Sequence, residues 1–226
     1  MDARWTLVTF CAAAYLIGSL PLGYWVTRWR RLGLDIRGYG SGNVGTANIY
    51  RHAGFALAAV IGPLQFVQGL LAVLLARYVG NVTGAGLVVV GVLAVVGNGW
   101  SLFLRFDGGR GVAVSTGAVA GLNPIALAAL LVCFAAGALR GRIAEGVLAG
   151  FIVLPFAGLI LAITPARAGW SLPVGLVVIL LLILARRLQG VVDDVNHFGK
   201  GRQVVLDRVF HDRRPGRPLV GHRTDP

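Results

Sequence analysis

Long stretches without a charged residue alternate along the chain with short basic clusters. The first covers residues 5–26 and carries no charge over 22 residues. At about 1.5 Å per residue, a helix of that length crosses a hydrocarbon layer of roughly 30 Å. The other uncharged stretches are residues 53–76, 78–104, 111–139, 146–166 and 168–185. This pattern is typical of membrane-spanning helices, so we predict an all-α fold, a polytopic membrane helix bundle over residues 1–190.

The stretch 111–139 has to be divided, because Asn123-Pro124 interrupts it. Proline lacks the amide donor and restricts the residue before it, so a helix ends at this point. The piece before the break is only roughly 18 Å long, too short to span a bilayer alone. We therefore predict seven membrane segments, one of them a short half-helix packed inside the bundle.

The basic residues predict the orientation, since short cytoplasmic loops collect lysine and arginine. Seven segments with the N-terminus outside place 18 of the 21 basic residues inside and leave only Arg4, Arg77 and Arg167 outside. The inner positions are residues 28–51, 105–110, 140–142 and 186 onward. Residues 191–226 are predicted to form a cytoplasmic tail. Its last stretch, residues 211–226, is rich in arginine and proline, and the end of this stretch is expected to be disordered.

Composition excludes several classes of protein. The chain is 56% hydrophobic and only 13% charged, with a net charge of +12. The basic residues form short clusters rather than one continuous face, so we expect no nucleic-acid partner. Cys11 and Cys133 lie in apolar stretches without a metal-ligand partner nearby, so neither a disulfide framework nor a metal site is expected. Transport is disfavoured because no acidic residue lies within a span, apart from Glu145 at an edge.

The first inner loop, residues 35–51, is unusually dense in glycine. Glycines allow positive φ and can turn successive amides toward one point, as in an anion-binding nest before a helix. The candidate phosphate-binding residues here are Gly40, Ser41, Gly42, Asn43, Gly45 and Asn48, with Arg51 as a flanking cation. From spacing alone a flexible loop that extends its arginines to lipid headgroups is equally compatible with this segment.

A second inner connection, residues 105–111, repeats the pattern with Gly108, Gly109, Arg110 and Gly111 before the predicted half-helix. Amides at the helix start and the Arg110 guanidinium would supply a second anion contact. The alternative is a tight turn whose arginine reflects only the charge bias of inner loops. Two such loops on the same side favour the anion site.

Both loops contain strings that resemble those of the bacterial acyl-phosphate:glycerol-3-phosphate acyltransferases. The strings are G-S-G-N-V-G-T-A-N-I-Y-R at residues 40–51 and F-D-G-G-R-G-V-A at 106–113, preceded by Y-L-I-G-S-L-P-L-G-Y at 15–24. The resemblance covers roughly residues 15–115. It implies a seven-helix enzyme of the bacterial plasma membrane with an external N-terminus and a cytoplasmic site.

The resemblance also implies a reaction, in which a fatty acyl group passes from acyl phosphate to the 1-hydroxyl of glycerol 3-phosphate and gives lysophosphatidic acid. No cofactor, metal or acyl-enzyme is implied, and the partners are the two substrates and membrane lipids. The residues implied to act in catalysis are Ser41, Arg51, Arg110 and Asn196. The glycines and asparagines named above would cradle phosphate, with Asn196 matching the asparagine of the family's C-terminal motif.

Several polar positions depart from the family pattern. Gln65 and Gln68 stand where the second helix usually has aspartate and lysine, Asn98 replaces a histidine, and Asp193 stands at the histidine of the C-terminal motif. We expect the three amides to hydrogen-bond between helices. These departures leave a second hypothesis open, a non-catalytic relative that binds phosphate or lipid headgroups.

Overall fold

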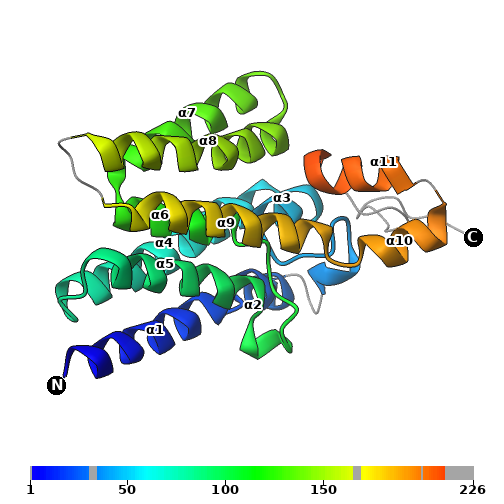
Figure 1. Cartoon of the computed structure of the whole chain (residues 1–226). Helices are drawn as coiled ribbons and strands as arrows, with labels where there is room; N and C mark the ends of the chain where they lie inside the picture. The colour runs from blue at the N-terminus through cyan, green and yellow to red at the C-terminus, as the bar shows by residue number, and fades with distance from the viewer. Residues whose placement is uncertain (1, 31–34, 165–168, 200, 212–226) are drawn as a thin grey trace, which may run out of the picture.

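The structure is a computed structural model that describes residues 2–30, 35–164, 169–199 and 201–211. Every regular element in these ranges is helical (Figure 1). The elements in chain order are α1 Ala3–Ser19, α2 Leu22–Arg30, η1 Ile36–Gly38, α3 Thr46–Ala53, α4 Phe55–Tyr78, α5 Gly84–Gly99, η2 Leu102–Leu104, α6 Val112–Leu122, α7 Pro124–Leu139, α8 Ile143–Ile163, α9 Ser171–Leu188, α10 Val191–Phe198, α11 Gly201–Leu206 and η3 Asp207–His211. The prediction of an all-α bundle is confirmed.

Five helical segments among the described residues are long and apolar enough to cross a membrane. They are Ala3–Arg30, Phe55–Tyr78, Gly84–Leu104, Ile143–Ile163 and Ser171–Phe198, and α6 and α7 are shorter apolar helices. The break predicted at Asn123-Pro124 is present, because Asn123 caps α7 by accepting from the amides of Ile125 and Ala126.

The first predicted span is not one continuous helix. It breaks at Leu20 and Pro21 into α1 and α2, because proline has no amide to continue the helical hydrogen bonds. Gln68 of α4 donates to the carbonyls of Ile17 and Leu20 at 2.7 and 3.0 Å. The side-chain amide of a neighbouring helix thus adds a second donor to two carbonyls at the break, which also accept from the amides of Leu20 and Leu22.

The short helix α6 is buried against one half of α4. A Cβ on Gly69 would lie 1.9 Å from the Val114 carbonyl oxygen, and one on Gly117 would lie 1.8 Å from that of Phe66. The two backbones are thus in direct contact, as small residues allow in membrane bundles. Arg77, in the last turn of α4, donates to the Leu122 carbonyl at 3.1 Å. The half-helix therefore begins level with the middle of α4 and ends beside its C-terminus.

The polar segments gather at one end of the bundle. Figure 1 shows α2, α3, α10 and α11 together there, whereas the N-terminus lies at the other end. Residues 191–211 of the predicted tail form α10, α11 and η3, and η3 contacts α8 and α9. The predicted disorder at the end of the tail concerns residues outside the described ranges.

Candidate functional site

The first glycine-rich loop is built around the buried side chain of Asn48, which is 0% exposed. Its Nδ2 donates to the carbonyls of Ile36, Tyr39 and Asn43 at 3.2, 3.1 and 2.9 Å, and its Oδ1 accepts from the amide of Ser41 at 3.1 Å. These bonds give the loop one defined shape, which argues against a flexible loop. Asn48 therefore stabilises the loop from its buried side. It does not line the cleft between this loop and the arginines, which is described below.

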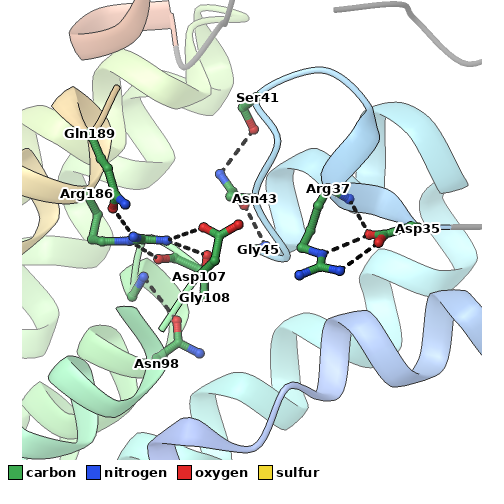
Figure 2. A network of polar contacts seen from close by, with 12 residues as sticks. Asp35, Arg37, Ser41, Asn43, Gly45, Asn98, Asp107, Gly108, Arg186 and Gln189 are labelled. Carbon is green, nitrogen blue, oxygen red and sulfur yellow. Dashed lines mark hydrogen bonds and ion pairs between the residues drawn. The ribbon is translucent and has the colours of Figure 1, made fainter. Parts of the chain in front are cut away.

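Several of the loop amides are used inside the loop. Ser41 donates to Asn48, Gly42 donates to the Tyr39 carbonyl at 2.9 Å, and Gly45 donates to Asn43 Oδ1 at 2.6 Å. The predicted nest of free amides is therefore not formed by these three residues. What the loop presents instead is the side-chain pair of Ser41 and Asn43, joined by a 3.1 Å bond from Asn43 Nδ2 to Ser41 Oγ (Figure 2).

The second loop is attached to the end of α5. The amides of Gly108 and Gly109 donate to the carbonyls of Gly99 and Asn98 at 3.1 and 2.8 Å, and the amide of Gly111 donates to Asn98 Oδ1 at 3.1 Å. The close approach requires glycine, because a Cβ on Gly108 would lie 2.1 Å from the Asn98 carbonyl oxygen. These amides were predicted to bind phosphate, but in the structure they bind the protein itself.

Arg186, in the last turn of α9, holds the other side of this loop. Its Nε donates to the Gly109 carbonyl at 3.0 Å and its Nη2 to the Gly108 carbonyl at 2.7 Å, with Asp107 Oδ1 at 3.4 Å. Figure 2 shows this guanidinium between Gln189 and Asp107. Sequence reasoning placed Arg186 among the bases of the inner side and did not assign it to this loop, because an arginine pair at the end of an apolar helix is typical of snorkelling to the membrane surface.

Arg110 lies in a cluster of positive charges and is only 8% exposed. Burial holds the pKa of its guanidinium well below the ordinary value. The charges that lower this pKa further are those of Arg187, Arg208, Arg186 and Arg51. Because arginine stays charged in proteins, a dianion that enters the cluster relieves this repulsion.

Two aspartates contribute negative charge to this cluster. Asp107 pairs with Arg186, and Asp194 pairs with Arg208. Arg187 is 3% exposed, and its buried Nε has no hydrogen-bond partner among the described residues. The cluster is therefore a strongly positive region suited to a phosphate group.

A cleft of about 330 Å³ opens where the loops and the arginine cluster meet. Its lining residues are Ser41, Gly42, Asn43, Asp107, Arg110, Arg186, Gln189, Gly190, Asp193 and Arg208. Ser41 and Asn43 face the Arg186 side across it in Figure 2. The structure thus brings together four of the predicted site residues, Ser41, Gly42, Asn43 and Arg110.

Other predicted residues lie elsewhere. Asn196 is exposed on α10, one turn beyond Asp193, and does not line the cleft, so the structure does not place it with the other predicted catalytic residues. Arg51 is exposed on α3, although its charge reaches Arg110. Gly40 lies against His52, since a Cβ there would be 2.1 Å from His52 Nε2.

The amides at the departing positions serve the scaffold, as expected. Gln65 accepts from Thr46 Oγ1 at 3.0 Å and donates to the Val44 carbonyl at 3.3 Å, which fixes the first loop on α4. Gln68 bonds the end of α1, and Asn98 bonds the second loop. Gln65 and Asn98 thus hold the two loops in position, and Gln68 joins α4 to the end of α1.

Comparison with known proteins shows relatives that match most of this chain. A model of the family described as "Glycerol-3-phosphate acyltransferase" matches residues 8–191, so Asn196 lies beyond the match. Glycerol-3-phosphate acyltransferase 5 of Dehalococcoides mccartyi is 35% identical over 91% of this chain and 88% of its own. Glycerol-3-phosphate acyltransferase 1 of Deinococcus radiodurans is 37% identical over 77% of this chain and 85% of its own.

A solved structure has the same fold. The crystal structure of PlsY (YgiH), an integral membrane glycerol 3-phosphate acyltransferase, in its glycerol 3-phosphate form superposes with a TM-score of 0.72 at 26% identity. The match covers 87% of this chain and 93% of that chain. With its apolar helices, this chain is a multi-pass membrane protein. It belongs to the glycerol-3-phosphate acyltransferase family.

Proposed function

We propose that this protein transfers a fatty acyl group from acyl phosphate to the 1-hydroxyl of glycerol 3-phosphate in the cleft beside Arg110. One observation carries the proposal. In this member of the family, a cluster of buried arginines lies across one cleft from the side chains of Ser41 and Asn43. Relatives are named for the acylation of glycerol 3-phosphate, and PlsY has been solved in glycerol 3-phosphate and lysophosphatidic acid forms.

The cleft favours direct transfer between substrates. Ser41 is the one hydroxyl among the described lining residues, and its Oγ accepts from Asn43 with no histidine in the lining to act as its base. The glycerol 3-phosphate hydroxyl attacks the acyl carbonyl carbon, the bond from that carbon to the phosphate oxygen breaks, and the departing phosphate takes the hydroxyl proton. The protein contributes orientation and the arginine charges that stabilise both phosphates.

The proposed topology is seven membrane segments with the N-terminus outside and the cleft on the cytoplasmic side of the bacterial plasma membrane. Five apolar spans together with α6 and α7 support this number. The two loops and α10 contribute to one cleft at one end of the bundle, where most of the basic residues of the sequence were predicted to lie.

The test is an assay of purified protein in detergent with palmitoyl phosphate and glycerol 3-phosphate, with lysophosphatidic acid measured directly. We expect product with palmitoyl phosphate and none above background with palmitoyl-CoA. Binding of glycerol 3-phosphate without turnover of either donor would contradict the proposal and support the non-catalytic hypothesis.

A further inference from the structure

Arg208 of η3 lies beyond the family match in the sequence. In the structure it is buried against the C-terminal end of α9. It is 2% exposed, and it reaches the cleft from η3. Its Nε donates to Asp194 Oδ2 at 2.9 Å, and its Nη2 donates to the same oxygen and to the Gly190 carbonyl at 3.1 Å. Its Nη1 donates to the carbonyls of Arg187, at 3.5 Å, and Gln189. All five guanidinium donors of Arg208 are therefore directed at the protein.

The contact runs in both directions. Arg187 of α9 donates from its Nη1 to the carbonyl of Val209, the residue after Arg208. Each of the two arginines thus binds the backbone of the segment that carries the other. We call this group of four residues, Arg187, Asp194, Arg208 and Val209, the C-terminal clasp.

The clasp satisfies groups that a helix end leaves open. The last carbonyls of an α-helix have no partner within the helix and need one from outside. Arg208 supplies it for Arg187 in the last turn of α9 and for Gln189 at its C-cap. It also adds a donor to the Gly190 carbonyl, which already accepts from the Asp194 amide at 3.2 Å; Gln189 and Gly190 line the cleft. Arg186, in the same turn, holds the second glycine-rich loop. The position of this cleft wall therefore depends on a side chain about twenty residues farther along the chain.

We infer that residues 201–211 are a working part of the substrate site, in which Arg208 is a positioning residue that fixes the α9 wall of the cleft for the phosphate of glycerol 3-phosphate. This inference rests on the proposed function for its substrate. Arg208 acts through geometry, since its donors are occupied by the protein, and a lysine in its place keeps the charge but lacks the planar fork that reaches several acceptors at once.

The test compares Arg208→Lys with Arg202→Lys, a matched change at an exposed arginine of α11. We expect Arg208→Lys to raise KM for glycerol 3-phosphate by at least about tenfold, at a temperature well below its unfolding midpoint. Amide hydrogen exchange in residues 186–198 should become faster in this variant. Arg202→Lys should match the parent in both measurements.

Two results would overturn the inference. The first is a KM for glycerol 3-phosphate in Arg208→Lys equal to that of the parent. This result would mean that the site needs only the positive charge at position 208, or that Arg208 serves only folding. The second is unchanged hydrogen exchange at the end of α9. Arg208→Lys is used in place of Arg208→Ala because lysine keeps the positive charge at this buried position. If the parent protein has no transferase activity, the proposed function fails. The clasp is then still tested by amide hydrogen exchange in residues 186–198 and by the rise in unfolding midpoint with inorganic phosphate, which should both change in Arg208→Lys and not in Arg202→Lys.

Discussion

Asn48 shows how one side chain can determine the shape of a functional loop. Replacing Asn48 with Asp keeps the size and the acceptor for Ser41, but it sets an oxygen against the three carbonyls that Nδ2 now binds. Each buried group left without a partner costs about 1–3 kcal/mol, so we expect a large loss of thermal stability and of activity.

The matched control is Asn123→Asp. The Asn123 side chain accepts from the amides of Ile125 and Ala126, which a carboxylate does equally well at a helix N-cap. Unfolding midpoints in detergent should fall for Asn48→Asp and stay near the parent for Asn123→Asp. Equal midpoints would contradict the role given to Asn48.

His52, which lies against Gly40 of the same loop, makes the stability of the protein depend on pH. Burial, followed by the nearby Arg51 charge, lowers the pKa of its imidazole below the ordinary 6.5. Between the folded pKa and 6.5 the unfolded chain binds more protons, so this contribution is fully present above about pH 6.5 and is lost as pH falls through the folded pKa. The unfolding midpoint should fall on acidification, and less so in His52→Gln.

The exposed His197 provides the comparison for this experiment. His197→Gln should follow the parent curve of midpoint against pH. A His52→Gln curve that also follows the parent would show that His52 does not contribute to the pH dependence.

At the scale of elements, sequence patterns predicted the helices better than the loops. Uncharged length and the Asn123-Pro124 break located the spans and the half-helix, because both depend on local properties. The break at Pro21 was missed because apolar composition continues through it. The glycine-rich loops were correctly singled out, but many of their amides turn inward, and hydrogen bonds of this kind depend on backbone geometry that composition does not report.

Two of the site residues that sequence reasoning missed are arginines whose partners are distant in the chain. Arg186 binds residues 77 to 79 positions earlier, and Arg208 binds the end of α9 about twenty positions earlier. Neither contact leaves a local pattern. Asn196 was predicted from a motif match, yet it lies beyond the family match and outside the cleft lining.

The contact of α6 with α4 gives a prediction at this scale. Replacing Gly117 with Ala would place a Cβ 1.8 Å from the Phe66 carbonyl oxygen and force the helices apart, although alanine normally stabilises a helix by roughly 1 kcal/mol over glycine. We expect a lower unfolding midpoint. Gly62→Ala in α4 would meet nothing nearer than the Thr46 methyl at 3.2 Å and should be tolerated; the opposite order would contradict the packing.

For the whole molecule, the proposed topology is tested by labelling. The background is a variant with Cys11 and Cys133 replaced by alanine. A single cysteine is then introduced at Gly141, which is exposed in the α7–α8 connection, or at Tyr78, which is exposed at the end of α4. A membrane-impermeant thiol reagent should label position 78 in intact cells and position 141 only after the membrane is opened. Labelling of position 141 from outside would reverse the orientation or change the number of segments.

The proposed function requires that acyl transfer takes place in the cleft beside Arg110. The most direct measurement is the rate of lysophosphatidic acid formation from palmitoyl phosphate and glycerol 3-phosphate in Arg110→Ala and in Arg105→Ala. Both arginines belong to the connection between α5 and α6, but only Arg110 is buried and lines the cleft. Loss of a charge-assisted bond worth about 1.5–3 kcal/mol predicts a kcat/KM at least about tenfold lower for Arg110→Ala, with Arg105→Ala near the parent. A folded Arg110→Ala protein with the parental rate would contradict the account.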